Sequence, residues 1–234
     1  MKNALKFVIA LIVTILLMLA FRAVAFTVFT VNGAALSPDF VAGDRVLVNR
    51  WSYGLRIGNG GMDGGTRWLA SPVAKGDLVV YNSPPDAQQG IASRPVCIGY
   101  CKGVPGDTVR LKRIALTLPG RRHPVTVSAA NAMMLAFLYN RYEGKAARAV
   151  DGRLYVDGVE VRKASFSRDY YWFLTGRKDN LADSRFFGPL PEECVIGRVT
   201  MLLYSIVPAC PLFERLRQDR WLLFISDGDS SSRR

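Results

Sequence analysis

Short apolar runs separated by glycine, proline and aspartate fill most of this chain beyond its first 25 residues. Three of these runs directly follow a Gly-Asp pair, at Gly43-Asp44, Gly76-Asp77 and Gly106-Asp107. Glycine and aspartate favour tight turns, and a run of roughly four to eight residues rich in β-branched side chains between such turns predicts a strand. A further pair, Asp157-Gly158, separates two such runs at the spacing of a two-residue hairpin turn. We therefore expect a mainly β fold.

One segment within this pattern is expected to be helical. Residues 129–142 have a composition that favours a helix, and their apolar side chains recur at helical spacing. The side chains on that stripe are Met134, Leu135, Leu138 and Tyr142. We expect the helix to belong to a small inserted subdomain at about residues 112–150, within a main domain that spans residues 26–226. Residues 227–234 are expected to form a disordered tail.

The N-terminal segment decides on which side of a membrane the chain lies. Residues 7–21 carry no charged side chain; Lys2 and Lys6 precede them and an arginine follows. Such a run could be the core of a cleaved secretory signal that ends at Ala23-Val24-Ala25. It could equally be a retained anchor whose N-terminus stays in the cytoplasm under the positive-inside rule. Both alternatives export the rest of the chain.

We favour the anchor, which would comprise residues 1–25. It predicts a single-pass transmembrane helix in the inner (cytoplasmic) membrane, with the N-terminus cytoplasmic and the main domain on the extracytoplasmic side. Membrane lipid is then one partner of the chain.

Composition narrows the remaining partners. The 234 residues include 31 Lys and Arg against 19 Asp and Glu, which gives a formal net charge of +12. The basic residues are scattered, without a basic helix or an aromatic-basic repeat, so we expect a solvated surface and no nucleic-acid partner. His123 is the only histidine, and no second ligand stands near it at the spacing of a zinc site. We therefore expect no metal and no other cofactor.

The cysteines leave two alternatives open. They are Cys97, Cys101, Cys194 and Cys210. In an exported domain the four could form two disulfides, in any of three connectivities. On one strand, however, Cys97 and Cys101 would lie about 13 Å apart, which is too far for a bridge. We favour buried free thiols.

Five stretches of the chain, in order, resemble the sequence boxes of the bacterial type I signal peptidases, the serine-lysine signal peptidase family. They are the N-terminal apolar segment and residues 31–54, 76–84, 99–107 and 179–198. In the last stretch, Asp183-Ser184-Arg185 precedes two phenylalanines and a Gly-Pro pair, as in the family's corresponding box. The resemblance implies a signal-peptidase-like β-barrel or sheet domain that follows a membrane anchor. Asp183, Ser184 and Arg185 are expected to form a structural network around an ion pair.

The same comparison with the family shows which catalytic groups this chain lacks. The family cleaves signal peptides from exported preproteins with a serine nucleophile and a lysine base. The slot of the nucleophilic serine holds Ala35, and a methyl group cannot attack a carbonyl. The lysine, six residues before the proline of Pro-Gly-Asp, falls on Gly99. The serine that orients the lysine falls on Leu181, and the oxyanion serine falls on Gly33. The resemblance therefore implies that no catalytic residue is intact.

The resemblance implies that the substrate-binding groove can remain although the catalytic side chains are absent. In the family, the substrate lies extended between two strands and is bound through its backbone, and this β-augmentation needs no catalytic residue. The two strands here would be residues 27–31 and 96–99. The expected peptide-binding residues are Val31, Gly33, Ala34, Ala35, Leu36, Cys97, Ile98 and Gly99. Alanine and glycine in place of serine and lysine would make this groove drier and more apolar.

Three functions follow from these observations. The first is a membrane-anchored, signal-peptidase-like pseudoenzyme that holds extended exported polypeptides or envelope proteins. The second is an active signal peptidase with a non-standard nucleophile, for which Ser37, Cys97 and Cys101 are candidates without an evident base. The third is a structural β-protein whose old groove is filled. We favour the first and expect the chain to be inactive as a peptidase.

Overall fold

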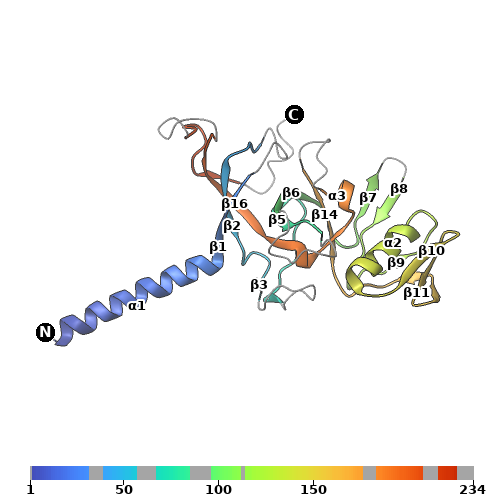
Figure 1. Cartoon of the computed structure of the whole chain (residues 1–234), viewed down its shortest axis with the longest axis horizontal. Helices are drawn as coiled ribbons and strands as arrows, with labels where there is room; N and C mark the ends of the chain where they lie inside the picture. Colours follow the sequence, from blue (N-terminus) through green and yellow to red (C-terminus); the bar gives the residue numbers. More distant parts are fainter. Residues whose placement is uncertain are drawn as a thin grey trace.

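The computed structural model describes residues 2–31, 39–56, 67–84, 96–111, 114–175, 183–207 and 216–225. These residues form a mainly β protein with few helices, which confirms the mainly β part of the predicted fold class. A long helix at the N-terminus leads into a curled sheet, and a smaller unit with a short helix lies at the other end of the molecule (Figure 1).

The main sheet has eight strands. Their order is β1-β2-β16-β5-β6-β14-β15, and β17 pairs with β16 beside this path. The bounds are β1 Phe26–Thr30, β2 Asp44–Asn49, β5 Leu78–Asn82, β6 Val96–Gly103, β14 Tyr170–Leu174, β15 Leu190–Pro191, β16 Val195–Ser205 and β17 Leu223–Phe224. Two of the Gly-Asp turns that we singled out do feed strands of this sheet, β2 and β5.

The strand β16 organises this sheet because it pairs with three neighbours along its 11 residues. It is antiparallel to β2, β5 and β17, and its register shifts against both β2 and β5. Such shifts increase the local twist and bend a strand, so they account for the curl of the sheet. At Gly197 a Cβ atom would lie 2.5 Å from the carbonyl oxygen of Asn49, so only glycine allows this close approach of β2 and β16.

The smaller unit is built from short strands around one helix. The strands are β7 Thr108–Leu111, β8 Ile114–Thr117, β9 Val125–Thr126, β10 Ala147–Val150, β11 Arg153–Val156, β12 Val159–Val161 and β13 Lys163–Ala164. Hairpins join β7 to β8 and β10 through β12, and β9 pairs with β13. The hairpin between β11 and β12 has Asp157 and Gly158 at its turn, both with positive φ, as the sequence predicts.

The predicted helix lies in this unit. It consists of α2, Ala132–Leu138, followed by one π-helical turn, η2, at Tyr139–Glu143. Leu135 and Leu138 are fully buried, Tyr142 is buried, and Met134 packs against the same cluster. This confirms the predicted apolar stripe. The cluster also contains Leu154 and Val156 of β11, together with Ala164, Phe166 and Tyr170. The smaller unit therefore has a hydrophobic core of its own.

Short elements complete the described chain. A two-stranded ribbon is formed by β3, Leu55–Arg56, and β4, Arg67–Trp68. Between β14 and β16 lie α3, Ser184–Phe187, and the 3-10 turn η3, Glu192–Cys194. Residues 227–234, which we predicted to be a disordered tail, lie outside the described residues.

The N-terminal helix, α1, runs over Lys2–Ala25 and continues directly into β1. Apolar side chains from Phe7 to Met18 are exposed along it, and it projects away from the sheet (Figure 1). Among the helices that the structure describes, none combines the length and the apolar character that crossing a bilayer requires. The expected helix is present, and its passage through a membrane stays a prediction.

The separate core of the smaller unit yields a testable contrast on a single helix. Leu135→Ala, which removes a fully buried side chain, should lower the free energy of unfolding by about 2–5 kcal/mol because it leaves a cavity. Met133 is 79% exposed, so Met133→Ala should change the free energy by no more than about 0.5 kcal/mol. Denaturant unfolding followed by circular dichroism measures both. Equal effects of the two variants would contradict the assigned orientation of α2.

Candidate functional site

The structure describes only part of the site that the sequence predicts. Gly33, Ala34, Ala35, Leu36 and Leu181 lie outside the described residues. The residues on either side of the segment that carries Gly33 to Leu36 are described. The backbone N–H of Val31 donates to the Asp44 carbonyl at 2.8 Å, and the Val31 carbonyl accepts a hydrogen bond from the N–H of Gly43 at 3.0 Å. The pairing of β1 with β2 therefore continues to Val31, which holds the two ends of that segment together.

Two strand edges lie open next to this position. On β6, Val96 to Tyr100 pair with β5 on one side, whereas β14 pairs on the other side only from Tyr100 to Gly103. Within the described residues, the backbone from Val96 to Gly99 therefore has a β partner on one side only. The same holds for β1, which pairs with β2 alone. An unpaired edge offers N–H and C=O groups to any extended chain that can reach it.

Side chains of the two strands meet in one hydrophobic cluster. Val31 and Ile98, exposed by 3% and 8%, belong to it, and Phe29 and Tyr100 pack against it. Cys97 packs partly buried in a different cluster. Because strand side chains alternate, Cys97 and Gly99 point to the face of β6 opposite to Ile98. The structure thus brings Val31 and Ile98 together and turns Cys97 and Gly99 away from them.

The position of the family's lysine is closed by its neighbours. A Cβ atom on Gly99 would lie 3.0 Å from the Leu174 carbonyl oxygen and 3.3 Å from Cε1 of Tyr81. Both distances are tighter than ordinary van der Waals contact, so any side chain here would force its surroundings apart. Tyr81 is fully buried and stacks on Phe173 with ring centroids 4.8 Å apart. The first side-chain atom of a lysine at position 99 would therefore be in tight contact with this ring.

The nearest lysine in the sequence cannot take over this role. Lys102 is exposed, and its ammonium lies 5.3 Å from the centroid of the Tyr100 ring. Residues 100 and 102 share one face of β6, and Gly99 belongs to the other. The amine of Lys102 is therefore solvated and points away from position 99.

A buried carboxylate stands next to this closed position. Asp183 is fully buried and accepts hydrogen bonds from the backbone N–H and the hydroxyl of Thr175, at 3.1 and 3.0 Å. Arg185 adds its backbone N–H and its guanidinium, which forms an ion pair with Asp183. Burial alone would raise the pKa of Asp183, but the hydrogen bonds from Arg185 and Thr175 outweigh it and hold the pKa below its ordinary value.

The hydroxyl of Ser184 completes this arrangement, since it accepts the backbone N–H of Phe173 at 2.9 Å. Asp183 also caps the N-terminus of α3 through Arg185. All three side chains therefore connect α3 to the end of β14. The structural role that we expected for Asp183, Ser184 and Arg185 stays a prediction, and these contacts are the ones on which it rests.

The thiols near this site are unreactive by their surroundings. Cys97 and Cys101 are free thiols, and Cys210 lies outside the described residues. Burial raises the pKa of Cys97 to about 11, with the Asp183 charge adding to the effect, and burial raises the pKa of Cys101 to about 12. A nucleophilic cysteine needs a lowered pKa, so neither thiol has the surroundings of one. Among the described residues, no cluster of three or more His, Cys, Asp or Glu side chains could hold a metal ion.

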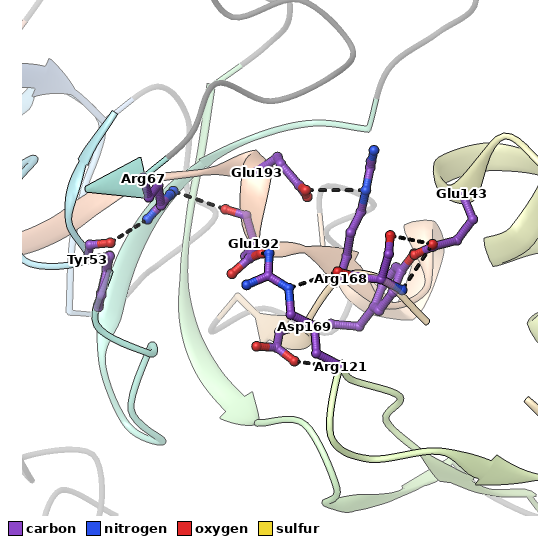
Figure 2. A network of polar contacts seen from close by, with 10 residues as sticks. Tyr53, Arg67, Arg121, Glu143, Arg168, Asp169, Glu192 and Glu193 are labelled. Carbon is purple, nitrogen blue, oxygen red and sulfur yellow. Dashed lines mark hydrogen bonds and ion pairs between the residues drawn. The ribbon is translucent and has the colours of Figure 1, made fainter. Parts of the chain in front are cut away.

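A polar network that the sequence did not reveal fixes the smaller unit to the sheet (Figure 2). Arg121 pairs with Glu192 of η3, and its backbone N–H donates to Asp169 at 2.9 Å. Arg67 of β4 donates to the carbonyls of Glu192 and Tyr53 at 3.0 and 3.1 Å. The partners are far apart in sequence, so spacing alone gave no signal for them.

The network extends into the helix of the smaller unit. The Glu143 carboxylate of η2 accepts hydrogen bonds from the hydroxyls of Ser167 and Tyr170, at 2.6 and 3.0 Å, and Arg168 pairs with Glu193 at 3.3 Å (Figure 2). Two ion pairs and these hydrogen bonds thus connect the smaller unit to the sheet, and the network stabilises the junction between them.

Comparison with known proteins gives these observations a family. The sequence model described as "Signal peptidase, peptidase S26" matches residues 4–204. The chain belongs to this family. It is 25% identical over 188 residues to a signal peptidase I of Pseudomonas fluorescens, which covers 73% of this chain and 62% of the relative. It is 23% identical over 196 residues to signal peptidase I V of Bacillus subtilis (strain 168), covering 81% and 92% of the two chains.

A third relative, signal peptidase I of Aquifex aeolicus (strain VF5), is 23% identical over 239 residues, covering 86% of this chain and 84% of that one. The chain spans 62% of the length of the Pseudomonas relatives that it matches. The predicted resemblance to the signal peptidases is therefore confirmed, and what this chain does within the family is a separate question.

The Asp183 network predicts a pH-dependent stability. Asp183→Asn should lower the free energy of unfolding by about 2–3 kcal/mol at neutral pH, because Arg185 loses its buried counter-charge. The folded pKa is depressed, so the contribution is complete above about pH 5 and disappears as the pH falls through the folded pKa. Chemical unfolding of wild type and variant at several pH values measures this.

A matched control is available at an exposed carboxylate. Asp107 pairs with Lys75 at 3.1 Å, and their side chains are 33% and 64% exposed. Asp107→Asn should cost less than about 1 kcal/mol, since exposed ion pairs contribute little. A stability gap for Asp183→Asn that stays constant down to acidic pH would contradict the assigned network.

The raised pKa values of Cys97 and Cys101 predict slow alkylation of both thiols in the folded protein. At neutral pH, iodoacetamide should modify Cys97 and Cys101 far more slowly than a free thiol because both remain protonated. Mass spectrometry of the peptides gives the modified fraction of each, and the guanidinium-unfolded protein is the control. Fast labelling of Cys97 in the folded protein would reopen its candidacy as a nucleophile.

Proposed function

We propose that this chain is a non-catalytic member of the signal peptidase family that holds extended segments of exported polypeptides or envelope proteins. The bound segment lies between β1 and the first half of β6, anchored near a membrane by α1. The family membership is the starting point for the proposal, and three features of the structure support it.

The first feature carries the proposal, and it is the closure of position 99. A lysine base must present an unprotonated amine to the nucleophile, which requires a desolvated site with room for the side chain. Here a Cβ atom would already be in tight contact with Tyr81 and the Leu174 carbonyl, and the position itself has no side chain. Ala35, at the family's nucleophile position, lacks a hydroxyl. Acyl transfer by a serine-lysine dyad therefore has neither of its two groups.

The second feature is the pair of open edges. An extended peptide that adds to a strand edge gains backbone hydrogen bonds without any catalytic group, and apolar side chains beside the edge supply pockets. The residues from Val96 to Gly99 keep one edge unpaired among the described strands, and β1 keeps another. Phe29 and Tyr100, which are partly buried, pack between them against the core cluster of Val31 and Ile98. Gly33, Ala34, Ala35 and Leu36, together with Cys97, complete the set of proposed peptide-binding residues.

The third feature supports placement at a membrane. Apolar side chains from Phe7 to Met18 are exposed along α1, and Lys2 and Lys6 precede them in the sequence. A row of apolar residues continues from it across the outer face of the sheet. Val28 lies opposite Leu47, Leu47 opposite Met201, and Met201 opposite Phe224. Side chains directly opposite one another on paired strands share a face, so this row forms one surface.

Phe224 is 81% exposed and Val28 is 45% exposed, so water would touch the row if the protein stood free in solution. We propose that lipid covers it, with the helix in the inner membrane, the N-terminus cytoplasmic and the domain on the extracytoplasmic side. An apolar surface of this kind is favourable only where it is removed from water.

The alternative is an active signal peptidase with another nucleophile. The described thiols have raised pKa values, and Lys102 points away from position 99. No observation on the described residues favours this alternative, so it enters only as an outcome of the test below.

The test uses the purified full chain in detergent and a fluorescent synthetic peptide that contains a signal peptide and its first mature residues. The peptide should bind and stay intact on prolonged incubation, as followed by fluorescence anisotropy and mass spectrometry. Two matched peptides carry N-methyl groups on alternate residues, in one register or the other. N-methylation in the register that faces a strand edge should weaken binding about tenfold through two or more lost hydrogen bonds.

The outcomes separate the candidates. Insertion between both edges predicts that either register weakens binding, whereas binding on one edge predicts that a single register does. Cleavage at a defined site that a single substitution abolishes would establish an active peptidase, and an acylating inhibitor would then locate its nucleophile by mass spectrometry. Peptides that bind equally well with and without N-methyl groups would contradict backbone pairing.

A further inference from the structure

The Gly43-Asp44 turn contains a fully buried carboxylate that the family resemblance does not explain. Asp44 has no exposed surface. One of its oxygens, Oδ2, accepts the backbone N–H of Val41 at 2.9 Å, which closes the turn. A buried carboxylate is unfavourable unless its charge is matched, so the counter-charges must come from elsewhere in the chain.

Two arginines from the C-terminal segment supply these counter-charges. Arg220 donates from Nη2 to Oδ2 of Asp44 at 2.6 Å and from Nε to Oδ1 at 3.3 Å, a bidentate contact. The Nη1 atom of Arg217 lies 3.8 Å from Oδ1 and donates to the hydroxyl of Ser205 at 2.7 Å. The guanidinium groups are 19% and 29% exposed, so water screens these pairs less than it screens surface pairs.

The same arginines also hold the backbone of the turn. Arg220 donates to the carbonyl of Asp39 at 2.9 Å, and Arg217 donates to the carbonyl of Ala42 at 3.2 Å. The carboxylate of Asp39 in turn accepts the hydroxyl of Tyr100, on β6, at 3.1 Å. Residues 39–44 are thus tied to the C-terminal segment on one side and to β6 on the other.

The C-terminal segment is itself fixed along β16. Leu216 bridges to Ile206, and β17 pairs with Met201 and Leu202. The N–H of Ile225 donates to the carbonyl of Thr200 at 3.2 Å, and Ile225 packs against the cluster that contains Val31 and Ile98. Arg217 and Arg220 lie beyond residues 4–204, the part of the chain that matches the family.

We propose that residues 216–225 act as a strap that positions residues 39–44 and thereby one wall of the peptide-binding groove. Arg217 and Arg220 are positioning residues. They contact no bound peptide, but they fix the turn that follows the segment carrying position 35 and that hydrogen-bonds to Val31. The link to peptide binding rests on the proposed function, whereas the strap itself does not.

The test is hydrogen exchange of the full chain together with binding of the fluorescent signal peptide. In the double variant Arg217→Gln with Arg220→Gln, amide exchange at residues 39–44 should become at least about tenfold faster, because the turn opens locally without global unfolding. The apparent affinity for the peptide should fall about tenfold, since only the fraction with an ordered turn is competent. The single variant Arg220→Lys, which keeps the charge, should show smaller changes than the double variant in both the exchange rate at residues 39–44 and the peptide affinity.

Two further variants keep the test decisive. The double variant leaves the buried charge of Asp44 unpaired and could unfold the domain. A triple variant therefore adds Asp44→Asn, which removes this charge, while the contacts of the two arginines to the Asp39 and Ala42 carbonyls remain absent. It should fold and still exchange fast at residues 39–44. Arg168→Gln breaks an ion pair of comparable exposure, to Glu193, away from the turn, and should leave exchange there unchanged.

Each result bears on one claim. Exchange at residues 39–44 that stays at the wild-type rate in the double and triple variants overturns the strap. If exchange at residues 39–44 is faster in the variants but the wild type binds no peptide, the strap is supported and the proposed peptide-binding groove is contradicted. Faster exchange with undiminished peptide affinity shows that the turn does not shape the groove, and overturns the positioning role of the two arginines.

Discussion

The antiparallel pairing of β16 is the constraint on which the rest of the sheet depends. This strand pairs with β2, β5 and β17, so it connects the half of the sheet that follows α1 with the half that contains β6 and β14. Its register shifts bend the sheet, and Gly197 allows the close approach to β2 that the bend requires. Without this strand, Val31 and Ile98 would belong to separate surfaces instead of one cluster.

This member of the signal peptidase family keeps a polar network beside position 99, to which we assign the family's lysine. Tyr81 and the Leu174 carbonyl close position 99, yet the Asp183 network beside it has all of its hydrogen bonds. The two have different physical roles. The buried carboxylate contributes to stability and cannot be lost without leaving Arg185 unpaired, whereas a lysine that is kept neutral by burial costs stability. A non-catalytic chain, as we propose, lacks the unfavourable group and keeps the favourable network.

Much of the fold could be predicted from the sequence, because turns and periodicity are local. The Gly-Asp pairs located strands β2 and β5, and the apolar stripe located α2. The site could be predicted only in part. The resemblance placed position 99, and strand alternation placed Lys102 on the opposite face. The closure by Tyr81 and the pairing of Asp44 with Arg217 and Arg220 could not be predicted, since these contacts join segments whose separation along the chain carries no periodic signal.

The direct passage of α1 into β1 has a mechanical consequence. The helix ends at Ala25 and the strand begins at Phe26, with no linker to absorb rotation. A strand rises about 3.4 Å per residue, so Val31 lies roughly 20 Å along the chain from the end of the helix. In the proposed function, this direct junction couples the orientation of the helix to that of the groove, so a tilt of the helix in the membrane would turn a bound peptide with it.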